Sequence, residues 1–151
     1  MKEIIIYTDG GCRGNPGKGA WAAILMYGNN KKEITGFSEN TTNNIMEITA
    51  VIKGLEMLKE SCYVSVYSDS NYVVNSVEKG WINKWQQKNW TKYNVITKEV
   101  EEVKNKELFQ RLFELINIHK VKFIKVKGHS DNELNNRCDL LVNETMDSNI
   151  I

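Results

Sequence analysis

The chain has 151 residues, of which 41% are hydrophobic, and this length predicts one domain, residues 1–151, with a core of its own. The formal net charge of +1 neither favours nor excludes a nucleic-acid partner unless the charges are clustered. The three cysteines form no CxxC pair and stand apart from the two histidines, which excludes the common zinc-finger spacings and is typical of a reduced, intracellular protein.

The first part of the chain predicts three strands. Residues 3–9 are β-branched and aromatic and end before two glycines, so they predict a strand buried on both faces. Their apolar run is too short for a signal peptide or a membrane span, and we therefore expect a cytoplasmic protein without membrane contact. Residues 20–27 and 31–38 flank the turn sequence GNN and predict two further strands of an antiparallel meander.

The hydrophobic period then changes to that of a helix. Apolar residues recur at three- and four-residue steps over residues 43–60, which predicts an amphipathic helix capped by Thr42 or Asn43. Residues 62–69 alternate into a fourth strand, and Ser70 caps the helix that follows it.

The last part of the chain alternates between helices and one strand. Residues 81–104 predict a short helix, an irregular loop and, in the charged run KEVEEVK, the lead-in to the helix at 106–119. A fifth strand at 121–128 and a final helix at 132–146 complete the chain. This order predicts an α/β fold with a five-stranded mixed sheet, three antiparallel strands followed by two parallel ones, flanked by helices.

Four carboxylates stand at informative places. Asp9 and Asp69 end two strands that a strand–helix–strand crossover makes parallel neighbours, so they are expected side by side. Two carboxylates that close cannot both stay ionised without a cation, and Mg²⁺ or Mn²⁺ suits oxygen ligands. Each also has an ordinary alternative: Asp9 as a tight-turn residue before glycines, Asp69 as a helix cap, and Glu47 and Asp139 as solvent-exposed helix residues. Spacing alone leaves both interpretations open.

Five ordered segments decide between them: YTDGGCRGNPGKGAWAAIL, TTNNIMEITAVIKGL, VYSDSNYVV, GWINKWQQKNW and VKGHSDNELNNRCDLL. Together they resemble bacterial ribonuclease H of type I over about residues 3–145. The resemblance implies a ribonuclease H-like fold and an endoribonuclease that hydrolyses the RNA strand of RNA–DNA hybrids. Two Mg²⁺ ions, for which Mn²⁺ substitutes, would give 5′-phosphate and 3′-hydroxyl ends. The metal ligands implied are Asp9, Glu47, Asp69 and Asp139, and His129 would assist proton transfer or product release.

The resemblance also implies how the hybrid is bound. The 2′-hydroxyl distinguishes the RNA strand, and backbone of the glycine-rich loop can approach a sugar edge. The positions that match substrate contacts of the family are Cys12, Gly14, Asn15, Thr42, Asn43, Asn44, Asn71, Trp81, Lys84, Trp85, Lys88 and Trp90. Without the family resemblance, the residues favour an ordinary wide turn for the loop and a helix start for the asparagines. Trp81 and Trp85 stand four residues apart, so they equally fit a helix that packs on the core.

Some positions depart from the family pattern. Gln86 and Gln87 stand where many relatives have basic residues, Asn71 replaces a common glutamine, and KEVEEVK adds acidic charge. We therefore expect salt-sensitive binding carried by a few lysine–phosphate contacts.

The sequence bears on several other functions. The glycine-rich loop fits neither the GxGxxG nor the GxxxxGK[ST] pattern, which excludes dinucleotide and P-loop sites. The alternatives are a catalytically weak module that binds RNA–DNA hybrids and a nuclease of the same fold that acts on duplex DNA. We expect a monomer without an obligate protein partner.

Overall fold

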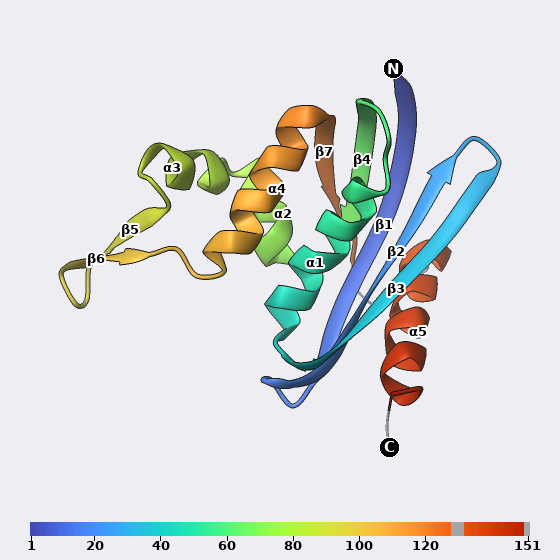
Figure 1. Ribbon diagram of the computed structural model, residues 1–151, viewed down its shortest axis with the longest axis horizontal. Coiled ribbons are helices and arrows are strands. Elements are labelled where there is room, and N and C mark those ends of the chain that lie inside the picture. Colours follow the sequence, from blue (N-terminus) through green and yellow to red (C-terminus); the bar gives the residue numbers. More distant parts are fainter. Residues whose placement is uncertain (128–131, 150–151) are drawn as a thin grey trace.

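The sheet of this protein has the strand order β3-β2-β1-β4-β7, seen in the computed structural model, which describes residues 1–127 and 132–149 (Figure 1). Strands β2 and β3 pair antiparallel with their neighbours, and β4 and β7 pair parallel, so the predicted mixed sheet is confirmed. The elements of the described residues are, in chain order, β1 (Lys2–Arg13), β2 (Gly17–Tyr27), β3 (Asn30–Thr41), α1 (Asn43–Glu56), β4 (Cys62–Ser68), α2 (Asn71–Glu78), α3 (Trp81–Gln87), β5 (Thr91–Asn94), β6 (Glu99–Glu102), α4 (Lys106–Ile118), β7 (Lys120–Lys125) and α5 (Glu133–Asp147).

Helices cover the two faces of the sheet unequally. The larger core joins one face to α1, α2, α3 and α4, with side chains such as Ile6, Leu55 and Phe109 fully buried. A smaller core joins the opposite face of β1 and β2 to α5 alone, through Cys138 and Val142 among others. Figure 1 shows α5 on the other side of the sheet from α1 and α4.

This uneven cover corrects the prediction that the first strand is buried on both faces. Ile4 and Ile6 are buried against the larger core, whereas Ile5 is 36% exposed. The reason is that α5 spans only part of its face of the sheet, so the start of β1 meets solvent on that side. The strand also continues past the two glycines to Arg13.

The helix starts follow the expected caps. The Thr42 hydroxyl accepts a hydrogen bond from the Ile45 backbone N–H at 3.2 Å, and the Ser70 hydroxyl does the same for Val73. No helix among the described residues is long and apolar enough to cross a membrane.

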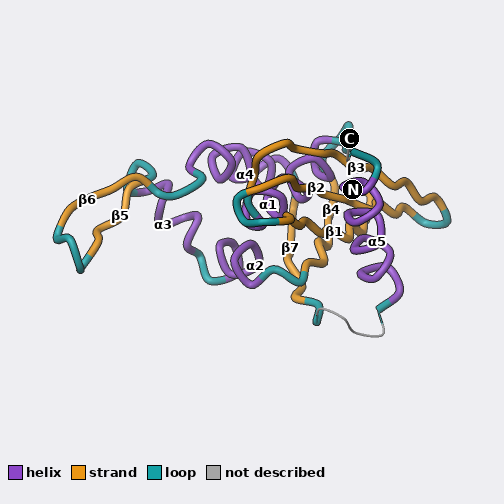
Figure 2. The backbone as a smooth tube through the Cα atoms, turned by 90° about the horizontal axis from the view of Figure 1, so that it is seen from below, coloured by secondary structure: helices purple, strands orange, loops and turns teal. Residues whose placement is uncertain are grey.

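The segment after α3 corrects a second prediction. Residues 91–102 form a two-stranded hairpin, β5 and β6, in place of an irregular loop and a helix lead-in. Tyr93 pairs across the hairpin with Val100, and Lys98 at the turn has a φ of +59°. The hairpin extends away from the rest of the molecule in both views (Figures 1 and 2). Alternating side chains of a hairpin and the charges of a helix start are hard to separate in a run such as KEVEEVK.

Candidate active site

The site lies where β1 and β4 separate. These parallel neighbours pair in register as far as Tyr7 and Tyr67, and the carboxylates stand two residues further on each chain. Asp9 and Asp69 are therefore side by side, as predicted from the crossover between their strands. The Thr8 hydroxyl donates to the Tyr67 carbonyl oxygen at 3.2 Å, which closes the end of this pairing.

Gly10 brings the third carboxylate to this point. A Cβ atom at Gly10 would lie 2.4 Å from the Met46 carbonyl carbon and 2.5 Å from the Glu47 nitrogen. Only glycine therefore allows the first turns of α1 to contact β1 this closely. The Gly10 N–H then donates to Glu47 Oε1 at 2.9 Å, which directs the glutamate toward Asp9.

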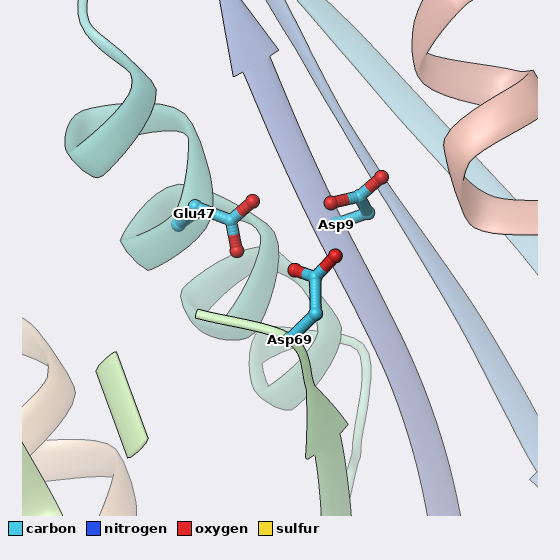
Figure 3. Close-up of side chains that lie close together, drawn as sticks. All are labelled: Asp9, Glu47 and Asp69. Atoms are coloured by element: carbon cyan, nitrogen blue, oxygen red, sulfur yellow. The ribbon is translucent and has the colours of Figure 1, made fainter. Parts of the chain in front are cut away.

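Asp9, Glu47 and Asp69 form an acidic triad. One carboxylate oxygen of each lies within 4.8 Å of the others, and Figure 3 shows the three side chains converging from β1, α1 and the end of β4. Asp9 is 6% and Glu47 8% exposed, and Asp69 is half-buried. Three oxygen ligands at this separation match the hard divalent cations Mg²⁺ and Mn²⁺.

Burial and repulsion disfavour ionisation of the triad. Burial, followed by the charge of Asp69, raises the pKa of Asp9 to about 7. Burial, followed by the charges of Asp9 and Asp69, raises the pKa of Glu47 well above its ordinary value. Since the causes are desolvation and like charge, a bound cation would remove the repulsion and allow all three to ionise.

An orphaned oxygen supports the same conclusion. Glu47 Oε2 is fully buried, and no group of the described residues hydrogen-bonds to it. A buried carboxylate oxygen without a partner is unfavourable unless a ligand satisfies it. The residues present therefore fit a divalent cation.

The two remaining predicted catalytic residues are Asp139 and His129. Asp139 is on α5 and exposed, and its charge contributes to the raised pKa of Asp9, but it is not one of the three triad residues. His129 lies outside the described residues.

Several of the predicted substrate residues meet at one end of the sheet. Asn15 Oδ1 accepts a hydrogen bond from the Asn43 N–H at 3.1 Å, so the glycine-rich loop is tied to the start of α1. Cys12 Sγ donates to the Thr41 and Gly14 carbonyl oxygens at 3.3 and 3.4 Å. The exposed or half-exposed members of this group are Cys12, Gly14, Asn15, Thr42, Asn43 and Asn44. Asn71, at the start of α2, is also exposed.

The tryptophan and lysine segment divides into packing and surface residues. Trp90 is 8% exposed and meets Phe113 edge to face at 5.9 Å, so its ring belongs to the core. Trp85 is half-buried between Trp81 and Phe109, with ring centroids 6.3 and 5.0 Å away. Lys84 and Lys88 are exposed. The packing alternative therefore applies to Trp85, which packs against the larger core, and Trp90 is itself buried in that core, while Trp81 and the lysines keep surface available for a ligand.

Two residues at the site escaped sequence reasoning. Gly10 reads as a turn glycine, and its contact with α1 depends on a residue 37 positions away. Lys125 belongs to a strand with lysines at alternate positions, and its ammonium group contacts the backbone of Asp69. The only feature of the sequence that points to Lys125 is its position at the end of a strand.

Comparisons with known proteins agree with this geometry. The family model described as RNase H matches residues 1–147. The chain is 55% identical over 149 residues to a ribonuclease H of Acetivibrio thermocellus, covering 99% of this chain and 98% of that protein. It is 57% identical over 139 residues to a ribonuclease H of Caldicellulosiruptor saccharolyticus, covering 92% of each.

Solved structures show the same fold. LC11-RNase H1 in complex with an RNA/DNA hybrid is 29% identical, with a TM-score of 0.68 over 96% of this chain and 97% of that chain. LC9-RNase H1, a type 1 RNase H with the type 2 active-site motif, has a TM-score of 0.84 over 99% of this chain and 74% of that one, at 21% identity. With a family model over nearly its whole length and relatives above half identity, the chain belongs to the ribonuclease H family and is a nuclease.

Proposed function

We propose that this protein is a Mg²⁺-dependent endoribonuclease that hydrolyses the RNA strand of RNA–DNA hybrids and leaves 5′-phosphate and 3′-hydroxyl ends. The observation that carries the proposal is the buried triad of Asp9, Glu47 and Asp69, in which one carboxylate oxygen has no partner and the pKa values of Asp9 and Glu47 are raised. Such a site needs a divalent cation before all its carboxylates ionise at neutral pH.

The triad would hold two ions together with Asp139. When bound, a pair of ions activates a water molecule on one side of a phosphate and stabilises the leaving oxygen on the other. Gly10 and the start of α1 keep Glu47 oriented, and burial around Asp9 excludes water from the ligands on that side. Asp139 stands exposed on α5, where it is free to adapt to the second ion. Mn²⁺ should replace Mg²⁺, because both take oxygen ligands.

His129 is proposed to assist proton transfer or product release. Histidine titrates near neutral pH, so it can accept and return a proton under the conditions of the reaction. Its removal should slow cleavage without abolishing it.

Recognition of the hybrid is proposed for the group at the glycine-rich loop and the start of α1. An enzyme that cuts only RNA in a hybrid has to detect the 2′-hydroxyl. The hydrogen bond from Asn43 to Asn15 makes the loop and the helix start one surface, from which exposed amides and backbone groups can reach a sugar edge. The relative LC11-RNase H1, whose structure contains an RNA/DNA hybrid, supports this class of substrate.

The DNA strand is proposed to contact α3. Lys84 and Lys88 would neutralise phosphates, the half-exposed Trp81 ring would lie against the backbone, and Thr42 and Asn71 would complete the contacts. Because Gln86 and Gln87 are uncharged and β6 carries Glu99, Glu101 and Glu102, the binding should rest on few cations and fall steeply with salt.

The first experiment is cleavage of an end-labelled RNA strand presented as an RNA–DNA hybrid, as an RNA duplex and alone, with Mg²⁺ or EDTA. Cutting confined to the hybrid and abolished by EDTA and by Asp9→Asn is expected, while the matched surface variant Asp147→Asn should cut like wild type. Migration of the products against markers with 5′-phosphate and 3′-hydroxyl ends tests the end chemistry.

Two other outcomes would replace the proposal. Binding of the hybrid without cleavage in Mg²⁺ or Mn²⁺ would make the protein a hybrid-binding module. Cleavage of duplex DNA in preference to the hybrid would make it a DNA nuclease of this fold. We further propose a cytoplasmic monomer; light scattering that gives twice the mass of 17.4 kDa would contradict the monomer.

A further inference from the structure

Lys125 is the last residue of β7, and its ammonium group reaches the turn that carries Asp69. Lys125 Nζ donates to the Asp69 backbone carbonyl oxygen and, at 3.3 Å, to the Val126 carbonyl oxygen. The side chain thus crosses from the edge strand of the sheet to the chain segment that presents a triad carboxylate. The function proposed above gives this lysine no role.

The pairing of β4 with β7 makes this contact possible. Ser68 is in register with Lys125, and the Val126 N–H donates to the Ser68 carbonyl oxygen at 2.9 Å. Asp69 is the first residue beyond the paired part of β4 on both sides, since the pairing with β1 already ends at Tyr67. Its peptide group therefore lies outside the sheet ladders.

The turn at Asp69 is held by short-range contacts. The Ser70 N–H donates to Ser68 Oγ at 3.0 Å, and Ser70 Oγ caps α2. These contacts fix the residues before and after Asp69, while the Lys125 ammonium group engages the carbonyl of Asp69 itself. That peptide group defines the ψ angle of Asp69, so holding it restrains the Cα atom from which the Asp69 side chain extends.

We propose that Lys125 is a positioning residue of the metal site: it holds the Asp69 peptide group so that the carboxylate faces Asp9 and Glu47. The inference rests on the metal site proposed above. The ammonium group binds the backbone carbonyl of Asp69 and not its carboxylate, so it can orient this residue without occupying a metal-ligand position. Groups that orient metal ligands in this way commonly change metal affinity or activity about 10–100-fold when they are removed.

The same ammonium group is exposed, so a direct contact with a substrate phosphate is the main alternative. The two roles differ in what they predict. A positioning residue affects cation binding in the absence of nucleic acid and affects kcat, whereas a phosphate contact affects KM and its salt dependence.

The experiment compares Lys125→Met, which keeps the length of the side chain without its charge, with Lys125→Arg, which keeps a cationic donor. Lys122→Met is the matched control, because Lys122 is an exposed lysine of the same strand, in register with Ser65 and remote from the acidic triad. Mn²⁺ binding to the free protein is followed by electron paramagnetic resonance, kcat and KM are measured on an RNA–DNA hybrid at saturating Mg²⁺, and thermal unfolding verifies folding.

Lys125→Met should weaken Mn²⁺ binding and lower kcat, each by roughly tenfold, with KM nearly unchanged. Lys125→Arg should recover most of both losses, and Lys122→Met should match wild type. Unchanged or tighter Mn²⁺ binding by Lys125→Met would overturn the inference, as would a raised KM with normal Mn²⁺ binding. If Lys125→Met fails to fold, a Lys125→Arg variant that folds but lacks Mn²⁺ affinity would also overturn it. A wild-type protein that neither binds Mn²⁺ nor cleaves the hybrid would instead refute the proposed function, and the inference with it.

Discussion

Replacing Asp9 by asparagine should stabilise the metal-free protein while abolishing its activity. Asparagine has nearly the same shape but no charge, so the substitution removes the repulsion within the acidic triad and the desolvation of a buried carboxylate. Folding raises the pKa of Asp9 from 3.8 to about 7, a difference of about 3 units. Above pH 7 this shift lowers the free energy of unfolding of the metal-free protein by about 4 kcal/mol. We expect Asp9→Asn to raise the free energy of unfolding by roughly 2–4 kcal/mol at pH 8 in EDTA. The value of about 4 kcal/mol derived from the pKa shift is an upper limit, because the titration of Asp9 is coupled to that of Glu47.

The pH dependence of this gain follows from the direction of the shift. A carboxyl group with a raised pKa in the folded state favours folding at low pH, and this contribution is lost as the pH rises from 3.8 to about 7. The gain from Asp9→Asn should therefore be below about 2 kcal/mol at pH 5, grow up to pH 7 and stay constant above it. Saturating Mg²⁺ should reduce or reverse the gain, because the wild type binds the ion more tightly.

Urea unfolding in EDTA at pH 5 and pH 8, followed by circular dichroism, measures these differences. Asp147→Asn is the matched control: its carboxylate is exposed in an ion pair with Arg13, and such pairs contribute about 0–1 kcal/mol. A variant at Asp9 that is less stable than wild type at pH 8, or a gain that does not change between pH 5 and pH 8, would refute the electrostatic reasoning.

Three further predictions concern other parts of the molecule. Gly10→Ala should lower both activity and stability, the latter by about 1–3 kcal/mol, because a Cβ atom would meet the backbone of α1 at 2.4 Å; normal cleavage and a normal unfolding midpoint would contradict this. Burial lowers the pKa of His119, whose Nδ1 accepts a hydrogen bond from the Cys62 N–H at 3.1 Å. Compared with His119→Gln in urea unfolding, the wild type should therefore lose stability as the pH falls below about 6.5. A stability difference between the two proteins that stays constant from pH 8 to pH 5 would contradict this prediction. Lys84→Ala should weaken hybrid binding several-fold and reduce the slope of log K against log salt by about one, which a titration between 50 and 200 mM NaCl measures, with an unchanged slope showing that this lysine makes no phosphate contact.

Sequence periodicity was sufficient for most of the fold. Strands that pack on a continuous core repeat their apolar residues at steps of two, and helices at steps of three and four. This pattern is local, so it can be recognised in the sequence without knowing which elements pack together. The crossover between the first and fourth strands also predicted that Asp9 and Asp69 lie side by side, which the parallel pairing of β1 with β4 confirms. The family resemblance supplied Glu47, which residue spacing alone did not distinguish from a surface glutamate.

Tertiary structure decided what depends on contacts between distant segments. The open side of β1 at Ile5 follows from where α5 ends, and the hairpin at 91–102 follows from cross-strand pairing that its charged sequence conceals. Which carboxylates converge was also a tertiary outcome, since Asp9, Glu47 and Asp69 place oxygens within 4.8 Å of one another. Gly10 contacts Glu47, 37 positions away, through its backbone, and Lys125 contacts Asp69, 56 positions away, through its ammonium group. Neither contact produces a periodic pattern in the sequence. The sequence thus determined which elements form and which carboxylates they carry, whereas only the packing of those elements determined how the carboxylates are held together.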